Sequence, residues 1–248
     1  MPEAHPIDLA FVGSGNAFAP GRCWSGFMLG QQFLFDAPPT ALYSLKLLGM
    51  PLGALHTIFL SHFHADHFFG LPFLLIEYAY LTHRTENLTI VGPPETEDRL
   101  SRLIELGYPS LNRAERGYEL RFVEVDDGSQ HEVNGLSVES IEVDHGGELL
   151  RCFGFRVGEN GRTLAYTGDT NYCDQLERLA RDADVLVTDC TYAAGFNNPE
   201  HMSLDEVRVL QEKVGGDTQF VLTHLGQDVD IGDARRMTVA SDLARYRF

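Results

Sequence analysis

Apolar, β-prone segments interrupted by glycine turns occupy the first part of the chain. Residues 7–12 form an apolar run that breaks at residues 13–16 (Gly-Ser-Gly-Asn), a pattern typical of a strand entering a tight loop. Two further apolar runs, residues 27–29 and 33–35, lie close enough together to predict a hairpin. Residues 38–48 predict a helix with proline near its first turn.

From residue 57 onward, buried strands alternate with amphipathic helices. The predicted strands are residues 57–60, 88–91, 120–125, 136–143, 152–157, 163–166, 184–187 and 218–222. The predicted helices are residues 70–81, 95–106, 173–180 and 203–214. No period of about 20 to 50 residues recurs, which argues against a solenoid.

Hairpins mixed with strand–helix units predict two sheets packed face to face with helices outside. This is an α+β fold, a four-layer αββα sandwich. The 248 residues are 44% hydrophobic, enough for one substantial core, and no Pro/Ser/Gly-rich linker interrupts them. We therefore expect a single domain over residues 1–248.

The chain is strongly acidic. It carries 36 Asp and Glu residues against 19 Lys and Arg, a formal charge of −17, and it has only two lysines, Lys46 and Lys213. Such a surface repels polyanions, so we expect a small-molecule substrate and no long nucleic acid. No apolar run approaches the roughly 20 residues that span a bilayer, and the start is not basic, so we expect a cytoplasmic protein without a membrane partner. Four scattered cysteines predict reduced thiols.

The strongest chemical signal follows the predicted strand at residues 57–60. Six consecutive positions there contain three histidines and an aspartate, namely His62, His64, Asp66 and His67. Neutral imidazole and carboxylate are the ligands that zinc and similar divalent ions take in catalytic sites. Alternate residues of an extended segment share a face, so His62 and His64 can point one way while Asp66 and His67 turn away after a bend. The motif therefore predicts ligands for two neighbouring ions.

Three later residues can complete such a site. Each lies at or just after a predicted strand end, although each alone is ambiguous: His145, Asp169 and His224. With the first motif they make five histidines and two aspartates, the number that two metals sharing a bridging carboxylate and a bridging hydroxide require. We expect two divalent ions, zinc in the first place, with manganese or iron as alternatives.

In their order along the chain, these residues resemble the metallo-β-lactamase-fold hydrolases over nearly the whole length. The resemblance implies a dinuclear site at one edge of the sandwich. One ion would be held by His62, His64 and His145, the other by Asp66, His67 and His224, with Asp169 bridging.

Asp36 resembles that family's buried aspartate, which lies behind the site and orients the histidines. The alternative is a plain turn aspartate before two prolines.

Within that fold the chain most resembles the ribonuclease Z-like phosphodiesterases. The resemblance rests on the loop at residues 11–15 (Phe-Val-Gly-Ser-Gly), on a bridging aspartate in place of cysteine, and on the segments 189–191 (Asp-Cys-Thr) and 201–203 (His-Met-Ser). It implies that His201 is an acid or transition-state clamp, supported by Asp189 and Thr191. It also implies that Asp66 orients the hydroxide while holding a metal. A helix-entry residue is the alternative for His201.

Three features depart from the tRNA-processing members of that group. Residues 37–40 (Ala-Pro-Pro-Thr) replace a Gly-Glu-Gly type of segment, and Thr188 stands where those members have a histidine. No long glycine- and lysine-rich arm separates His145 from Asp169. Together with the negative charge, these departures disfavour tRNA maturation.

We therefore expect a dinuclear phosphodiesterase that acts on small or nucleotide-like phosphodiesters through a metal-bridging hydroxide. The alternatives are a lactonase or other ester or amide hydrolase, a tRNA 3′-end endonuclease, and a non-catalytic metal-binding sensor. Analogy with the group favours a homodimer. Six aromatic residues are candidates for a pocket rim that stacks a base or an acyl ring: Phe63, Phe68, Phe69, Tyr172, Tyr192 and Phe196.

Overall fold

The computed structural model describes residues 6–113 and 115–248. Its strands are β1 (Asp8–Gly13), β2 (Gly26–Leu29), β3 (Phe33–Phe35), β4 (Thr57–Phe59), β5 (Leu88–Gly92), β6 (Leu120–Glu124), β7 (Gln130–Val133), β8 (Leu136–Val143), β9 (Cys152–Glu159), β10 (Arg162–Tyr166), β11 (Val185–Asp189), β12 (Gln219–Thr223), β13 (Met237–Val239) and β14 (Arg245–Arg247). The helices are α1 (Ala41–Leu47), α2 (Ala65–Phe68), α3 (Leu71–Glu77), α4 (Thr96–Gly107), α5 (Pro109–Arg113), α6 (Gln175–Ala180) and α7 (Leu204–Val214). Shorter turns are η1 (Leu52–Ala54), a π-helical turn η2 (Tyr78–Thr82) and η3 (Gly147–Leu149).

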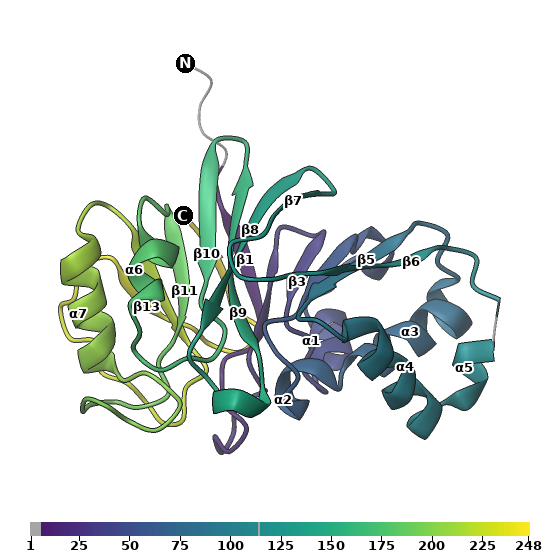
Figure 1. Cartoon of the computed structure of the whole chain (residues 1–248), viewed down its shortest axis with the longest axis horizontal. Helices are drawn as coiled ribbons and strands as arrows, with labels where there is room; N and C mark the ends of the chain where they lie inside the picture. Colours follow the sequence, from purple (N-terminus) through teal and green to yellow (C-terminus); the bar gives the residue numbers. More distant parts are fainter. Residues whose placement is uncertain (1–5, 114) are drawn as a thin grey trace.

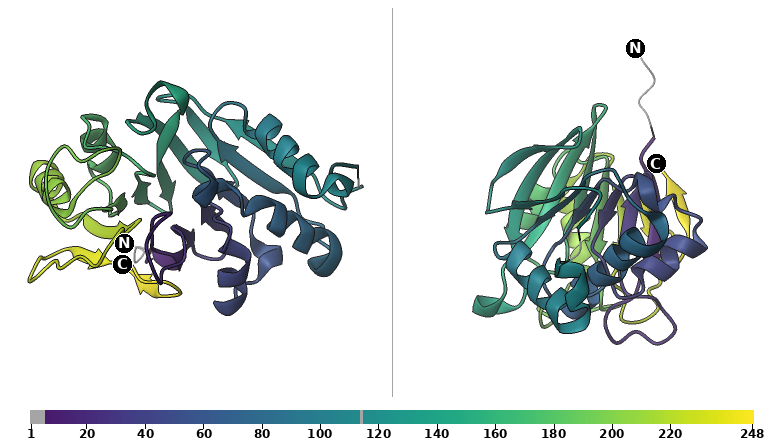
Figure 2. Two further views of the ribbon diagram at one scale, coloured as in Figure 1. Left: turned by 90° about the horizontal axis from the view of Figure 1, so that it is seen from below. Right: turned by 90° about the vertical axis from the view of Figure 1, so that its right-hand side faces the viewer.

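The strands form two sheets of seven strands each. The first has the order β14-β1-β2-β3-β4-β5-β6 and the second β13-β12-β11-β10-β9-β8-β7. Both sheets are mixed, because hairpin-linked antiparallel pairs stand beside parallel strands that are joined through helices. Helices flank the paired sheets on both sides (Figure 1, Figure 2), which confirms the predicted αββα sandwich.

Period-two alternation explains why the sheets pack this way. In β1, Leu9 and Phe11 lie in the hydrophobic cluster between the sheets, whereas Ala10 and Val12 lie in the cluster under the helices. The cluster between the sheets is rich in aromatic rings. The ring of Phe35 stacks on that of Phe59 with centroids 4.6 Å apart, so this layer is closely packed.

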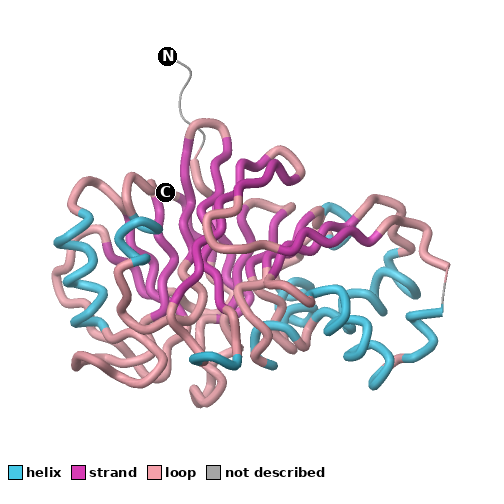
Figure 3. Tube along the Cα trace, viewed as in Figure 1, coloured by secondary structure: helices cyan, strands magenta, loops and turns pink. Residues whose placement is uncertain are grey.

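Each sheet has its own set of helices on the outer face (Figure 3). Apolar residues of α1, α3, α4 and α5 share one cluster with the outward side chains of the first sheet. Apolar residues of α6 and α7 share another with the second sheet. Over the described ranges 6–113 and 115–248, no helix is long and apolar enough to cross a membrane.

Most of the predicted elements are present, and the differences have local causes. The helix predicted over residues 38–48 begins only at Ala41, with Thr40 at its N-cap. A proline disfavours helical geometry in the residue before it, and this applies to Pro38, which precedes Pro39. The helix predicted over residues 70–81 leaves α geometry after Glu77 and continues as the π-helical turn η2. The pattern missed α2, α5, β7, β13 and β14. These elements have three to five residues, too few to show a period.

The packing predicts how stability depends on the inner layer. Phe59→Ala removes a fully buried ring that contacts Phe35 and Phe155, and it should lower the free energy of unfolding by about 3–5 kcal/mol. The same substitution at Phe18, which is 90% exposed, should change it by less than about 0.5 kcal/mol. Urea denaturation followed by circular dichroism measures both; similar losses in the two variants would contradict this packing.

Candidate functional site

The predicted site residues lie at one edge of the sandwich, where strands that run the same way end. His62, His64, Asp66 and His67 follow β4, and Asp36 follows the neighbouring parallel strand β3. In the second sheet, His145, Asp169 and His224 follow β8, β10 and β12, and β10, β11 and β12 are parallel. Carboxyl ends of parallel strands meet at one edge, so residues far apart in the sequence come together.

Four imidazoles surround one carboxylate oxygen. The distances from the Nε2 atoms to Oδ2 of Asp169 are 3.2 Å for His67, 3.2 Å for His224, 3.7 Å for His62 and 3.8 Å for His145. Asp169 is 2% exposed, so this charge lies among ring nitrogens rather than in solvent. A carboxylate in this position can be shared by two adjacent cations.

The side chains fall into groups with metal-site dimensions. In each group, one ligand atom per residue lies within 4.8 Å of all the others. Three such groups are present among the described residues: His62, His64, His145 and Asp169; Asp66, His67 and His224; and Asp169, Asp189, His201 and His224. The structure thus brings all seven predicted ligands together, and their division between two ions stays a prediction.

The polar atoms at the centre of these groups have no hydrogen-bond partner within the described part of the chain. These buried atoms are Nε2 of His62, Nε2 of His67, Nε2 of His224 and Oδ1 of Asp169. A buried polar atom without a partner costs about 1–3 kcal/mol, and four of them around one point are a strained arrangement for a protein alone. Cations coordinated here would satisfy all four atoms, so the residues present fit a metal centre.

The outward nitrogens of the same histidines are held by fixed partners. Nδ1 of His67 donates to Oδ2 of Asp36 at 2.8 Å, and Nδ1 of His145 donates to the backbone oxygen of Glu200 at 2.7 Å. With a proton on Nδ1, the lone pair is on Nε2, which faces the centre. The neighbours therefore set the tautomer that a metal requires.

The hydroxyl groups of Ser61 and Thr191 fix the tautomers of His62 and His224 in the same way. Oγ of Ser61 donates to Asp36 and so accepts from Nδ1 of His62 at 2.9 Å. Oγ1 of Thr191 donates to Asp189 and so accepts from Nδ1 of His224 at 2.9 Å. Each histidine thus reaches a buried carboxylate through one hydroxyl.

Asp36 lies fully buried behind His67. Its carboxylate accepts hydrogen bonds from the backbone and hydroxyl of Ser61, from Nδ1 of His67, and from the Tyr166 hydroxyl at 2.6 Å. A plain turn aspartate would face solvent, so these contacts argue against that alternative. Sequence reasoning missed Ser61 and Tyr166. Their only signal was position, beside His62 and at the end of a predicted strand.

Burial and close charges together shift the pKa values of the metal-free centre. Burial raises the pKa of Asp169, but His224 and His67 outweigh it and hold that pKa well below its usual range. Burial lowers the pKa of His67, but Asp169 and Asp36 raise it well above 6.5. At His62 burial dominates and lowers the pKa. Without metal, these shifts favour a charged His67 beside a charged Asp169, whereas a bound cation would favour the neutral tautomer described above.

His201 occupies the rim of this centre. Its Nδ1 lies 2.8 Å from Oδ2 of the fully buried Asp189, whose other oxygen accepts from Thr191. The ring centroids of His145 and His224 are each 4.9 Å away, so the imidazole lies beside both groups. Burial lowers the pKa of His201, but the Asp189 carboxylate outweighs that effect and raises the pKa to about 9.

The proposed aromatic rim is only partly present. Phe68 is buried in the cluster under the helices, because it lies on the inner side of α2, so its assignment to the rim is wrong. Phe63 is half-buried beneath the Arg99 guanidinium. Phe69 and Phe196 are exposed, with the latter 60% accessible, and their place at the rim stays a prediction. Tyr172 and Tyr192 are half-buried.

Comparison with known proteins agrees with this geometry. A ribonuclease Z from Methanosarcina mazei is 30% identical over 86% of this chain and 88% of its own. The crystal structure of YhfI from Bacillus subtilis, a metallo-β-lactamase fold protein, superposes with a TM-score of 0.74 at 20% identity, covering 98% of this chain and 100% of that chain. The crystal structure of the short form of human tRNase Z superposes with a TM-score of 0.75 at 22% identity, covering 97% of this chain and 98% of that chain.

Fold and site together define a metal-dependent hydrolase of the metallo-β-lactamase fold, related to ribonuclease Z. Residues 7–241 match the family model described as "Anti-Pycsar protein Apyc1", and the chain belongs to that family.

The His201–Asp189 pair predicts a pH dependence. Because the pKa is raised from 6.5 to about 9, the pair stabilises the metal-free fold fully below pH 6.5, and this contribution is lost as the pH rises through about 9. Asp189→Asn should move the pKa of His201 down toward 6.5, as followed by NMR of its ring proton in metal-free protein. An unchanged pKa would contradict the assigned cause. Asp98→Asn, on the exposed face of α4, is the control.

Proposed function

We propose that this chain is a dinuclear metal-dependent phosphodiesterase that hydrolyses small, nucleotide-like phosphodiesters. The observation that carries the proposal is His201, a histidine held by a buried carboxylate beside two metal-sized groups of ligands. An ester bond with a poor leaving group needs such a proton donor, because the departing alkoxide must be neutralised.

The proposed ligands follow the two groups. His62, His64 and His145 would hold one ion, Asp66, His67 and His224 would hold the other, and Asp169 would be a ligand of both. Zinc is the first candidate because imidazole and carboxylate suit it, with manganese and iron as the alternatives that metal analysis would identify. When bound, such a pair of ions supplies an activated water and neutralises phosphoryl oxygens.

The chain's own residues would do the rest. Nδ1 of His201 is engaged by Asp189, so Nε2–H is the group left to donate a proton to the leaving oxygen. Asp66 lies at the accessible side of the centre, its Oδ2 3.5 Å from Nε2 of His67. There it can accept the proton of the attacking water while keeping its place as a ligand. Thr191 and Asp36 keep the histidines oriented.

Charge supports a small substrate. Two divalent ions add four positive charges to a centre that contains two ligand aspartates, so a small anion is attracted locally. A long polyanion would also be repelled by the surface of a chain with a formal charge of −17.

RNA cleavage is the second candidate, because the relatives are named ribonuclease Z. Incubation with a precursor tRNA and with small cyclic and linear diesters separates the two candidates. The homodimer stays a prediction, which light scattering of the purified protein tests.

The ligand assignment predicts a joint loss of metal and activity. His62→Ala should remove a ligand of one ion, and Asp169→Ala should remove a ligand of both ions. In each variant, metal content and diester turnover should therefore fall together. Metal analysis by mass spectrometry and hydrolysis of bis(p-nitrophenyl) phosphate measure them on the same sample. Full metal content in either variant would rule out the assignment. His56→Ala, outside both groups, is the matched control.

The role of His201 predicts a different pattern. His201→Ala should keep two ions yet lose roughly 10²-fold or more in turnover of a diester with an alkoxide leaving group, such as a cyclic nucleotide, because the leaving oxygen loses its proton donor. The loss should be much smaller on bis(p-nitrophenyl) phosphate, whose p-nitrophenolate leaves without a proton. A chromogenic lactone, which needs less leaving-group assistance, is assayed in parallel. If the variant retains the wild-type rate on the diester with the alkoxide leaving group, His201 has no part in the reaction. Efficient lactone turnover with no diester cleavage by the wild type would favour an acyl hydrolase.

A further inference from the structure

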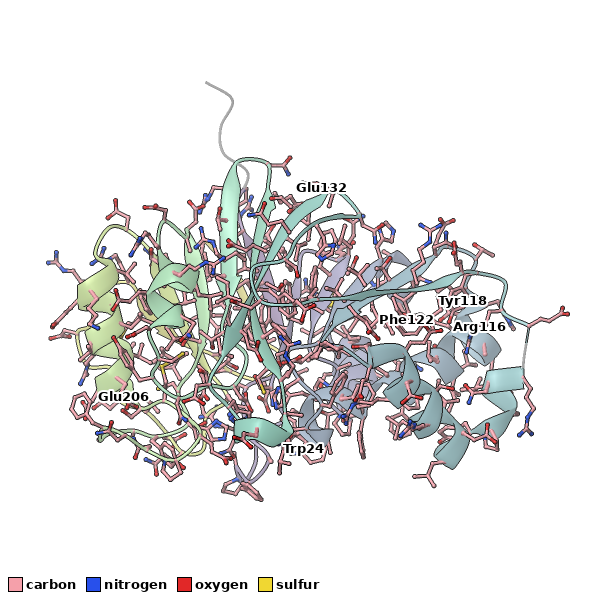
Figure 4. The ribbon with its side chains drawn as sticks, viewed as in Figure 1. Trp24, Arg116, Tyr118, Phe122, Glu132 and Glu206 are labelled. Carbon is pink, nitrogen blue, oxygen red and sulfur yellow. The ribbon has the colours of Figure 1, made fainter. Side chains whose placement is uncertain are left out.

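The glycine loop after β1 packs against the residue that follows His224. The backbone oxygen of Ser14 accepts from the Leu225 amide at 2.8 Å, and the Asn16 amide donates to the Leu225 oxygen at 3.1 Å. These bonds hold Leu225 from both its donor and its acceptor side. Trp24, near the far end of the same loop, is seen at the lower edge of the molecule in Figure 4.

The backbone of His224 needs such support. Its φ is +56°, in the left-handed region that side chains other than glycine rarely adopt, at a cost of order 1–3 kcal/mol. On one side, Oγ1 of Thr191 accepts from the His224 ring, and the backbone oxygen of Thr191 accepts from the Gly226 amide. On the other side the support comes from the loop at Ser14. The conformation that aims Nε2 at the centre therefore depends on where that loop lies.

One carboxylate fixes the loop at both ends. Oδ1 of Asp242 accepts from the backbone amide of Ser14 at 2.8 Å and from its hydroxyl at 2.7 Å. Oδ2 of Asp242 accepts from the Cys23 amide at 2.5 Å. Close packing explains the glycines: a Cβ on Gly13 would lie 1.9 Å from the Trp24 oxygen. The Gly-Ser-Gly motif thus connects Asp242 on one side to Leu225, the neighbour of His224, on the other.

We propose that Asp242 is a positioning residue for the metal centre, which acts through Ser14 and Leu225 to hold His224 in its ligand position. This rests on the proposed ligand assignment. Asp242 follows the region that the family model matches, which ends at residue 241. Loss of its carboxylate takes the acceptor from the Ser14 hydroxyl and from the Cys23 amide, and it leaves the Ser14 amide with the Cys23 oxygen alone, so the loop and the strained His224 backbone can relax together.

The test is a metal titration of Asp242→Asn. Metal-free protein is titrated with Zn²⁺ against a chromophoric chelator, which resolves the two binding events without an activity assay. One of the two affinities should fall about 10- to 100-fold, and the other should stay within about twofold of wild type. Excess Zn²⁺ should restore diester turnover, which a purely structural role would not produce. Asp233→Asn, which removes an exposed charge in the same segment, should titrate like wild type.

Two further variants distinguish the possible failures. If Asp242→Asn binds both ions as tightly as wild type while His224→Ala loses one, the positioning role is wrong and the ligand assignment stands. If His224→Ala also binds both ions normally, the ligand assignment itself is wrong. If Asp242→Asn does not fold by circular dichroism, Ser14→Ala replaces it, because it removes the hydroxyl bond to the same carboxylate, together with the bond that this hydroxyl accepts from Arg22, and keeps Asp242 itself. In Ser14→Ala, the weaker of the two Zn²⁺-binding events should lose up to about tenfold in affinity. A titration that is unchanged from wild type overturns the proposal.

Discussion

A single buried carboxylate joins the two sheets at the edge where the site lies. Asp36 follows β3 of the first sheet, and it accepts from Ser61 after β4 and from Tyr166 at the end of β10 in the second sheet. Its own φ is +56°, so the backbone is held in a costly conformation to present this group. In a buried environment, each donor would be left unpaired without it. The relative position of the sheets near the site, and hence of ligands drawn from both, depends on this contact together with the bond from the Phe153 amide to the Ser61 oxygen.

Around that contact, the protein balances its negative charge only in part before any metal is present. His67 lies between Asp36 and Asp169, and it pairs with both. Because metal ligands bind in their deprotonated forms, loading the centre and releasing a proton from His67 are coupled events. Hydroxyl relays at Ser61 and Thr191 keep the other rings aligned without adding charge. The site is preorganised by hydrogen bonds that lead to the buried carboxylates of Asp36 and Asp189.

The ligands themselves could be predicted from the sequence, because each follows a strand whose apolar pattern was clear. The HxHxDH motif at residues 62–67 and the strand ends before Asp169 and His224 were visible without coordinates. The partners that orient the rings were not visible. Glu200 contributes only a backbone oxygen, which leaves no sequence signal, and Tyr166 reads as an ordinary strand residue. Three-residue strands such as β13 and β14 are set by tertiary pairing, and local pattern carries little of that information.

The pairing of β1 with β14 has a consequence for how the chain is made. Asp8 of β1 aligns with Arg247 of β14, which is translated about 240 residues later. Until β14 is made, this edge of β1 has no pairing strand. Until then, the backbone groups on that edge are free to pair with another chain, and contacts of such long sequence separation form slowly. Synthesis therefore leaves the nascent chain with an open, apolar strand for most of translation. Holding that strand apart from other nascent chains is a task for the cell's chaperones.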